Sequence, residues 1–570
     1  MELLTKNAVQ ILEDRYLLKN DEGMVIETPE ALFKRVAEYI SGCENKDTAK
    51  WSQAFYNAMS ELKFLPNSPT LMNAGCDHAQ LSACFVLPVE DSLESIFTTL
   101  KNAALIHQSG GGTGFNFSAL RHKGDLISSN KGESCGPVSF MKIYDAATEY
   151  VKQGGKRRGA NMGILNVDHP DIEEFIMSKS DKKSIQNFNL SVGISNAFMK
   201  AVEDDLDWQL ISPHTQKVTR IISAKLLWEL IVQQAWKTGD PGLIFLDAIN
   251  NSNTTPDLGR IQATNPCGEV PLFDNESCNL GSVNLSRITI CTRGEYEINW
   301  LELSRIIHIG IRFLDNVITL NHYPLPEIKI TTLHSRRIGL GVMGWAELLI
   351  LLNIPYASKK ALVLAEKLMK FFQKESYSAS EKLAWERGAF PGWGLSKFGV
   401  SNRKMRNATC NSIAPTGTIS VIANTSYSIE PLFALAYRRM GILGGKIQTE
   451  INAVFIQKMK ELGLWNEETE KIVLETGNLN ECKNIPKKVK DIFTTGLNIP
   501  WQYHLLHQKI FQKYTDNAVS KTINLPGKTS IQDISDIYKT AYSYGLKGIT
   551  VYRYGSRAGQ VLQKCNVIGC

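Results

Sequence analysis

The chain has 570 residues and a formal net charge of +6, and 43% of its residues are hydrophobic and 21% charged. This balance is typical of a globular protein, and so small a net charge does not indicate a surface for nucleic-acid polymers. No apolar run reaches 18 residues and acidic residues interrupt the N-terminal stretch, so we expect no membrane span and no secretory signal, which favours the cytoplasm.

The first 80 residues are predicted to be helical. In "ETPEALFKRVAEYI", Thr28 suits the N-cap of a helix and Pro29 its first position. The apolar residues that follow recur on one face of that helix: Leu32, Phe33, Val36, Tyr39 and Ile40. We therefore expect a helical N-terminal region over residues 1–80.

From residue 81 the pattern changes to that of an α/β domain. Short apolar runs such as "ACFVLPV", "GILNV", "NLSVGIS" and "GLIFL" alternate with helical stretches such as "SLESIFTTLKNAALIHQ" and "AKLLWELIVQQAWKT". This alternation indicates buried, mostly parallel strands, and we assign it to one domain over residues 81–555. Residues 556–570, which contain Cys565 and Cys570, lack periodicity and are predicted to form a flexible tail.

Three glycine-rich segments punctuate the strands. "QSGGGTGFNFS" (108–118) lacks the spacing of a dinucleotide-binding fingerprint. "APTGTIS" (414–420) offers backbone N–H groups and hydroxyls that suit phosphate oxygens if a helix begins there, and the alternative is an ordinary strand-to-helix turn. "KQGGKRRGANMG" (152–163) is either a solvated basic loop or a contact to a nucleotide phosphate through Lys156, Arg157 and Arg158.

The most informative segment is "NPCGEVPLFDNESCNLGS" (265–282), which holds Cys267 and Cys278. A structural disulfide, a metal site and a redox site are the candidate explanations. The chain has 11 cysteines, and an odd number argues against a fully paired disulfide scaffold. No C-x-x-C motif occurs and no pair of histidines stands at ligand spacing beside these cysteines, so structural zinc is disfavoured and we predict no metal site. Redox chemistry is the hypothesis that remains.

The residues around Cys267 favour a catalytic loop. Pro266 and Gly268 disfavour regular helix and strand, so the segment is predicted to be a loop that presents its side chains. Asn265 supplies a neutral hydrogen-bond donor and Glu269 a general base on either side of the thiol. The alternative is a buried structural cysteine in a turn.

Together these motifs resemble those of class II, adenosylcobalamin-dependent ribonucleotide reductases. The match spans residues 7–562 and preserves the family's order of motifs: "NSPTLMNAG", "LSACFVLPV", "GGGTGFNFS", "KQGGKRRGANMGIL", "NPCGE", "ESCNLGSVNL", "APTGTIS" and "GLKGITVYR". The resemblance implies a ten-stranded α/β barrel made of two five-stranded parallel halves. It also implies that a finger loop threads the barrel with a radical cysteine at its tip.

The resemblance assigns roles to five residues. Cys267 matches the cysteine that becomes a thiyl radical and abstracts the 3′-hydrogen of the substrate ribose. Glu269 matches the base for the 3′-hydroxyl proton, and Asn265 the amide that holds the ribose hydroxyls. Cys84 and Cys278 match the dithiol that reduces the 2′ position and becomes a disulfide. Such chemistry needs a solvent-shielded pocket and a dithiol that can be regenerated.

The resemblance also implies binding sites and partners. Cys565 and Cys570 would relay electrons from a thioredoxin-like reductant, although their spacing is C-x4-C where C-x2-C is commoner. The loop with Lys156, Arg157 and Arg158 would link a deoxynucleotide effector to the substrate base, in a homodimer. The substrate, with a diphosphate favoured over a triphosphate, would contact Ser68, Ala83, Cys84, Gly112, Asn265, Pro266, Cys267, Gly268, Glu269, Pro415, Thr416, Gly417, Thr418 and Ile419.

The radical source is predicted from what the C-terminal strand lacks. Class I large subunits carry adjacent tyrosines there, whereas this chain has Thr550 and Val551 before Tyr552, and it also lacks a glycyl-radical motif. The resemblance therefore implies adenosylcobalamin, although no short motif identifies its contacts. No N-terminal ATP-cone is recognisable. The alternatives are a class I-type large subunit that needs a separate radical-generating subunit, and a regulator that binds nucleotides without catalysis.

Overall fold

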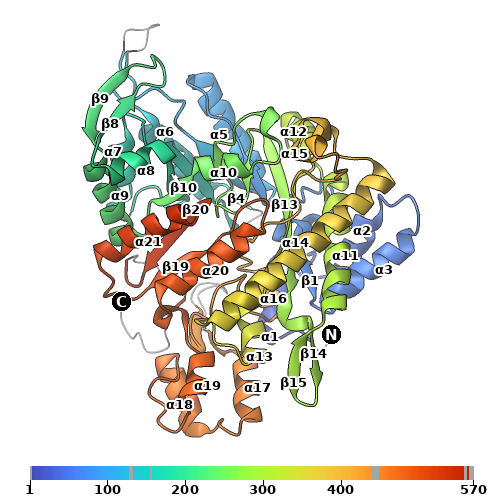
Figure 1. The fold of residues 1–570 in the computed structure, drawn as a ribbon. Coiled ribbons are helices and arrows are strands. Elements are labelled where there is room, and N and C mark those ends of the chain that lie inside the picture. The colour runs from blue at the N-terminus through green and yellow to red at the C-terminus, as the bar shows by residue number, and fades with distance from the viewer. Residues whose placement is uncertain are drawn as a thin grey trace.

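The computed structural model describes residues 3–126, 132–153, 157–181, 183–439, 448–556 and 562–563 (Figure 1). Its centre is a barrel built from two sets of parallel strands. Each strand of the first set pairs in parallel with the next. In spatial order, this set is β2 (Cys84–Val86), β3 (Gly112–Asn116), β6 (Asn161–Asn166), β7 (Phe188–Ile194) and β10 (Gly242–Phe245).

The second set completes the barrel. It runs from β13 (Glu276–Asn284) and β16 (Ile338–Met343) through the segment 411–413 to β19 (Thr522–Leu525) and β20 (Gly548–Arg553). β13 pairs in parallel with β16, and β19 pairs in parallel with β20. The parallel bridge Leu340↔Asn411 joins β16 to the segment 411–413, and the bridge Ile413↔Val519 joins that segment to the residues just before β19. Antiparallel pairs, β2 with β13 and β10 with β20, join the two halves. This confirms the predicted ten-stranded α/β barrel of two parallel halves.

The N-terminal helices cover one side of the second half-barrel. They are α1 (Lys6–Arg15), α2 (Pro29–Ser41) and α3 (Thr48–Ser60), and α2 and α3 pack against α11 (Trp300–Leu320) (Figure 1). The predicted start of α2 is confirmed, because the Thr28 side chain accepts a hydrogen bond from the Ala31 N–H. The region also contains strand β1 (Phe64–Pro66), antiparallel to β13, followed by α4 (Ser68–Asn73).

Helices also cover the first half-barrel and the front of the molecule in Figure 1. The predicted helical stretches are confirmed as α5 (Leu93–Gln108) and α9 (Ala224–Thr238). None of the described helices is both long and apolar enough to span a membrane. The other α-helices of the described residues are α6 (Pro137–Tyr150), α7 (Ile172–Met177), α8 (Asn196–Glu203), α10 (Leu246–Ser252), α12 (Pro326–Ser335), α13 (Trp345–Leu351), α14 (Lys359–Arg387), α15 (Lys397–Val400), α16 (Ile419–Ile422), α17 (Ala453–Glu461), α18 (Glu467–Thr476), α19 (Lys487–Ile492), α20 (Trp501–Lys513) and α21 (Ile531–Ser543).

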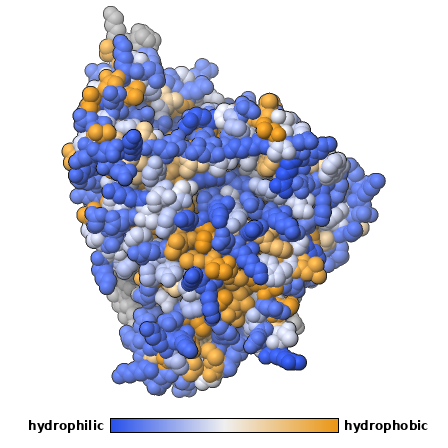
Figure 2. Space-filling model, in the orientation of Figure 1, coloured by the Kyte–Doolittle hydropathy of each residue, from blue (hydrophilic) through white to orange (hydrophobic). Residues whose placement is uncertain are grey.

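Short two- and three-stranded sheets lie outside the barrel. β8 (Asp207–Ile211) pairs with β9 (Val218–Ser223), and β14 (Thr289–Thr292) with β15 (Glu295–Ile298). β17 (Ala436–Arg439) lies between β18 (Gln448–Ile451) and β21 (Leu562–Gln563). Figure 2 shows that the face seen in Figure 1 is mostly hydrophilic, with hydrophobic residues gathered near its centre and in smaller groups toward its upper and lower ends.

The barrel interior holds its own apolar cluster, separate from the two large cores outside the barrel. It combines strand residues such as Val86, Ile164 and Ile244 with Ala263 and Val270. The last two belong to a hairpin inside the barrel, in which β11 (Ala263–Thr264) pairs antiparallel with β12 (Pro271–Leu272). The hairpin therefore forms part of the core that positions the candidate site.

Candidate active site

The tip of this hairpin, residues 265–270, is a tight turn organised by Asn265. The Asn265 N–H donates to the Val270 carbonyl at 3.2 Å, and the Val270 N–H donates to Asn265 Oδ1 at 3.0 Å. The Gly268 N–H donates to the Asn265 carbonyl at 3.1 Å, and Gly268 has φ +79°, which favours glycine. The predicted loop is confirmed, and the asparagine amide has a structural role in it.

Two glycines of β3 allow the hairpin to lie close to the barrel wall. A Cβ atom added to Gly114 would lie 1.7 Å from the Thr264 carbonyl oxygen, and one added to Gly112 would lie 2.8 Å from Pro266 Cγ. On β7, the Asn189 Nδ2 group donates to the Pro266 carbonyl at 2.8 Å. Sequence reasoning missed Gly114 and Asn189. The alternate glycines of "GGGTG" are the signal that a backbone approaches one face of this strand.

Cys84 and Cys278 lie directly opposite each other across the β2–β13 pair. Opposed residues of antiparallel strands have Cα atoms about 4.5 to 5.5 Å apart, which falls within the range that a disulfide requires. Neither cysteine forms a disulfide in the structure. They are 3% and 0% exposed, and burial raises the pKa of each thiol well above its usual range. The pair is thus a protonated dithiol that can close with little movement of the backbone.

The loop and the dithiol meet at Cys84. The Asn265 Nδ2 group donates to Cys84 Sγ at 3.1 Å. After burial, the neighbouring Glu269, Cys278 and Cys267 also raise the pKa of Cys84, so their side chains are close enough to interact with it. The structure thereby brings together all five residues to which the resemblance assigns catalytic or redox roles.

Glu269 is a buried carboxylic acid with a neutral-range pKa. It is 3% exposed, and within the described part of the chain its Oε2 atom has no hydrogen-bond partner. Burial raises the pKa of Glu269 to about 7. Its carbonyl oxygen accepts hydrogen bonds from the Ala518 N–H and the Ser412 hydroxyl, both at 2.8 Å. A buried carboxyl group with this pKa, on a backbone that is held in place, is suited to take up and release a proton at neutral pH.

Cys267 differs from its neighbours because it is exposed, while Asn265 is 2% exposed. The thiol lies at the turn of the hairpin, and the packed part of the hairpin ends at Pro266 and resumes at Glu269. The chain alone therefore does not provide the solvent shielding expected for a radical cysteine. It leaves the thiol accessible to a reaction partner.

Three further predicted contact residues lie around the dithiol or on the adjoining N-terminal region. The Ala83 N–H donates to the Cys278 carbonyl at 3.3 Å, and the Gly112 N–H donates to the Ala83 carbonyl at 2.9 Å. Ser68 begins α4, and its hydroxyl is 2.7 Å from the Tyr16 hydroxyl. Ala83 and Gly112 are thus adjacent to the redox pair through backbone contacts.

The segment 415–419 is a loop that leads into the short helix α16. The Thr416 hydroxyl is 2.7 Å from the Ser420 hydroxyl and accepts a hydrogen bond from the Ser428 N–H at 2.8 Å. These two hydroxyls therefore hold the loop together. Pro415 and Gly417 are exposed, and a Cβ atom at Gly417 would meet nothing within 4 Å. Any ligand of this loop would meet its backbone and Thr418 more readily than the Thr416 hydroxyl.

Part of the predicted effector loop and most of the predicted tail lie outside the described residues. This applies to Lys156, Cys565 and Cys570. Arg157 and Arg158 form β5, which pairs antiparallel with β4 (Lys152–Gln153). On β20, Thr550 and Val551 precede Tyr552, so the strand carries no adjacent tyrosine pair.

Comparison with protein families gives two adjoining matches. A family described as ribonucleotide reductase, all-alpha domain, matches residues 2–79. A family described as ribonucleotide reductase, barrel domain, matches residues 82–404 and 399–552.

Curated relatives and a solved structure are consistent with these families. The chain is 48% identical to a vitamin B12-dependent ribonucleoside-diphosphate reductase of Thermoplasma acidophilum, over 98% of this chain and 80% of the relative. It is 45% identical to a protein of the same name from Mycobacterium tuberculosis, over 98% and 80%. The class Id ribonucleotide reductase alpha subunit of Actinobacillus ureae shares the fold, with a TM-score of 0.80 and 24% identity over 97% of this chain and 98% of that one.

Proposed function

The chain belongs to the ribonucleotide reductase family, and we propose that it reduces ribonucleotides to 2′-deoxyribonucleotides with adenosylcobalamin as its cofactor. The relatives at 45% and 48% identity carry the name vitamin B12-dependent ribonucleoside-diphosphate reductase. The observation that carries the proposal is the placement of Asn265, Cys267 and Glu269 on one hairpin beside the opposed pair Cys84 and Cys278. The nucleotide-binding regulator without catalysis is disfavoured, because it would not require this complete set.

The hairpin residues divide the first half of the reaction between them. Cys267, as a thiyl radical, abstracts the 3′-hydrogen of the ribose. Glu269 takes the proton of the 3′-hydroxyl, a role that its pKa of about 7 and its fixed backbone support. Asn265 holds a ribose hydroxyl, and its bond to Cys84 Sγ ties this contact to the dithiol.

The dithiol completes the reduction. The 2′-hydroxyl leaves as water, and Cys84 and Cys278 supply two electrons and two protons as their thiols become one disulfide. The 3′-hydrogen then returns from Cys267 to the substrate. The direct opposition of the two cysteines supports this step, because a disulfide can form between strands that keep their register.

The exposure of the Cys267 thiol is compatible with adenosylcobalamin as the radical source. When bound, adenosylcobalamin supplies the radical chemistry that converts the Cys267 thiol to a thiyl. Cys267 is exposed and therefore accessible from outside the hairpin. Thr550 and Val551 stand where a class I large subunit would have its tyrosine pair, which disfavours the alternative of a partner subunit that delivers the radical. Bound reactants would then provide the shielding that the chain alone does not.

We also propose a homodimer with effector control. Apolar side chains are exposed on the neighbouring helices α5 and α6, among them Leu93, Phe97 and Ile143. Such a patch suits burial against a second copy of the chain. A deoxynucleotide would bind near the loop with Lys156, Arg157 and Arg158. A monomer with and without deoxynucleoside triphosphate in a size measurement would contradict this part of the proposal.

The reductant is proposed to act through the C-terminal tail. Cys565 and Cys570 would receive electrons from a thioredoxin-like protein and pass them to the buried disulfide. Replacing both with serine should abolish turnover driven by thioredoxin while leaving turnover driven by dithiothreitol. Equal loss with both reductants would argue against a relay.

An oxygen-free assay of the purified chain tests the main proposal. It contains a ribonucleoside diphosphate, dithiothreitol and a deoxynucleotide effector, with or without adenosylcobalamin. We expect product only with the cobalamin, and a parallel assay with the triphosphate tests the preference for a diphosphate. Product that needs a second protein and ignores cobalamin would instead support the class I alternative.

A further inference from the structure

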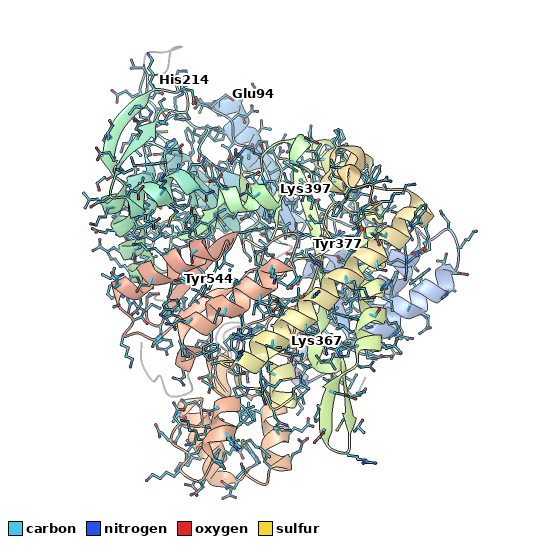
Figure 3. All side chains as sticks on the ribbon, in the orientation of Figure 1. Glu94, His214, Lys367, Tyr377, Lys397 and Tyr544 are labelled. Carbon is cyan, nitrogen blue, oxygen red and sulfur yellow. The ribbon has the colours of Figure 1, made fainter. Side chains whose placement is uncertain are left out.

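A second ligand site is indicated outside the catalytic hairpin and the dithiol. The cavity lies beyond the end of β10 and before the start of β20. Its volume is about 500 Å³, within the range of small-molecule sites. Figure 3 shows Tyr377, Lys397 and Tyr544, which line it, on neighbouring elements of one face.

The lining of this cavity is strongly cationic. It includes four lysines, Lys397, Lys509, Lys513 and Lys547, and one carboxylate, Asp516. The donors to the Asp516 oxygens, the Tyr377 hydroxyl and the Cys410 N–H, are neutral and do not cancel its charge. Lys513 also pairs at 2.8 Å with Glu366, which lies outside the lining. The lysines still outnumber these two carboxylates. An anion would therefore meet an excess of positive charge at this site.

Lys547 makes the floor of the cavity unusual. It is 6% exposed, and its ammonium group donates to the carbonyls of Asp516, at 2.6 Å, and Asn517. Burial lowers the pKa of Lys547 to about 7, although the neighbouring Asp516 favours its charged form. A bound anion would favour the charged form further.

The hydroxyl group of Thr254 also supports a ligand site in this cavity. Thr254 lines the cavity and is 7% exposed, and its hydroxyl oxygen has no hydrogen-bond partner among the described residues. Buried hydroxyls without partners are uncommon in folded proteins. Together with the lysines, Thr254 would provide a hydrogen-bond donor for an anionic oxygen.

The cavity is connected to the catalytic hairpin through a short stretch of backbone. Lys547 binds the carbonyl of Asn517, and the next residue, Ala518, donates its N–H to the Glu269 carbonyl at 2.8 Å. On the other side, the Lys397 N–H donates to the Thr254 carbonyl at 2.9 Å, in the segment that leads into the hairpin. A ligand that contacts Lys547 and Lys397 would therefore contact residues bound to both of these segments.

We propose that this cavity binds a small phosphate-bearing anion and that its occupant acts on the position of the hairpin that carries Glu269. The four lysines around a cavity of this size suit a di- or triphosphate group, which carries several charges in a small volume. The source is either a free inorganic polyphosphate or a nucleotide, and both share this chemistry. The site goes beyond the proposed reduction and does not depend on it, because binding can be measured without turnover.

Calorimetric titration of the full chain with inorganic triphosphate, and separately with ATP, tests the proposal. Physiological salt limits non-specific attraction, and a saturating ribonucleoside diphosphate and deoxynucleotide occupy the reaction and effector sites. The variant carries Lys509→Gln and Lys513→Gln, both exposed at the rim of the cavity. The control carries Lys367→Gln and Lys404→Gln, which are exposed outside the lining and remove the same charge.

We expect the rim variant to weaken binding of inorganic triphosphate about tenfold and the control by less than twofold. Tighter binding of ATP, with the same dependence on the rim lysines, would identify a nucleotide as the ligand. Similar affinities for ATP and inorganic triphosphate would identify free polyphosphate. Equal affinities in the wild type, the variant and the control, or no binding to the wild type, would refute the proposal.

Discussion

Replacing Glu269 with glutamine should change how the stability of the protein depends on pH. The folded-state pKa of this carboxyl is about 7, above its ordinary value of 4.5, because the group is buried. Between these pH values the folded state holds a proton that the unfolded state has released, so stability falls as pH rises through this window. A difference of this size corresponds to about 3 kcal/mol. Glutamine does not titrate and should remove that loss.

Urea denaturation at several pH values between 4.5 and 8 measures this effect. The stability of Glu269→Gln relative to the wild type should rise by about 3 kcal/mol across the range. Glu229→Gln, on the exposed face of α9, is the matched control and should follow the wild type. If the difference in stability between Glu269→Gln and the wild type were the same at every pH, the carboxyl would not titrate near neutrality in the folded protein. Its proposed role as a neutral-pH base would then lose its support.

Further predictions concern activity and the hairpin. The rate should rise with pH through about 7 as Glu269 ionises, and Glu269→Gln should lower it by about 10² to 10⁴ at pH 8, measured as deoxynucleotide formed. Cys267→Ser should abolish turnover and retain nucleotide binding by calorimetry; full activity would exclude the thiyl mechanism. Cys84→Ser should stop deoxynucleotide formation even with excess dithiothreitol, and normal turnover would show that another thiol is the reductant. Gly114→Ala should displace the hairpin, because its Cβ would lie 1.7 Å from the Thr264 carbonyl, and should lower both activity and stability, by about 1 to 3 kcal/mol or more. Gly394→Ala, which meets nothing within 4 Å, is its control in activity and urea denaturation assays.

Local sequence signals predicted the helices α2, α5 and α9 and four strands of the first half-barrel, β2, β6, β7 and β10. The cap at Thr28 and the bounds of α9 follow from nearby residues, and the structure confirms both. The barrel itself came from a resemblance carried by ordered motifs, because the alternation of strands and helices alone does not show that a sheet closes. Closure here depends on two isolated bridges at the segment 411–413, which has no strand pattern of its own.

The candidate site was less accessible to local reasoning. That Cys84 lies opposite Cys278 depends on the register between strands far apart in the sequence. The tight fit of Gly114 against Thr264 depends on a hairpin that enters from elsewhere in the chain. The sequence predicted that the Thr416 hydroxyl could bind phosphate, whereas in the structure it hydrogen-bonds to the Ser420 hydroxyl and the Ser428 N–H. Each of these features is set by tertiary packing.

The opposed cysteines also have a mechanical consequence. Cys84 belongs to the first half of the barrel and Cys278 to the second, so a disulfide between them is a covalent cross-link across the junction of the two halves. It would close a loop of roughly 190 residues, and loop entropy alone would then stabilise the oxidised fold by roughly 5 kcal/mol. Each turnover would thus leave the fold more resistant to unfolding than it was before, and reduction of the disulfide would remove that cross-link as it returns the two electrons.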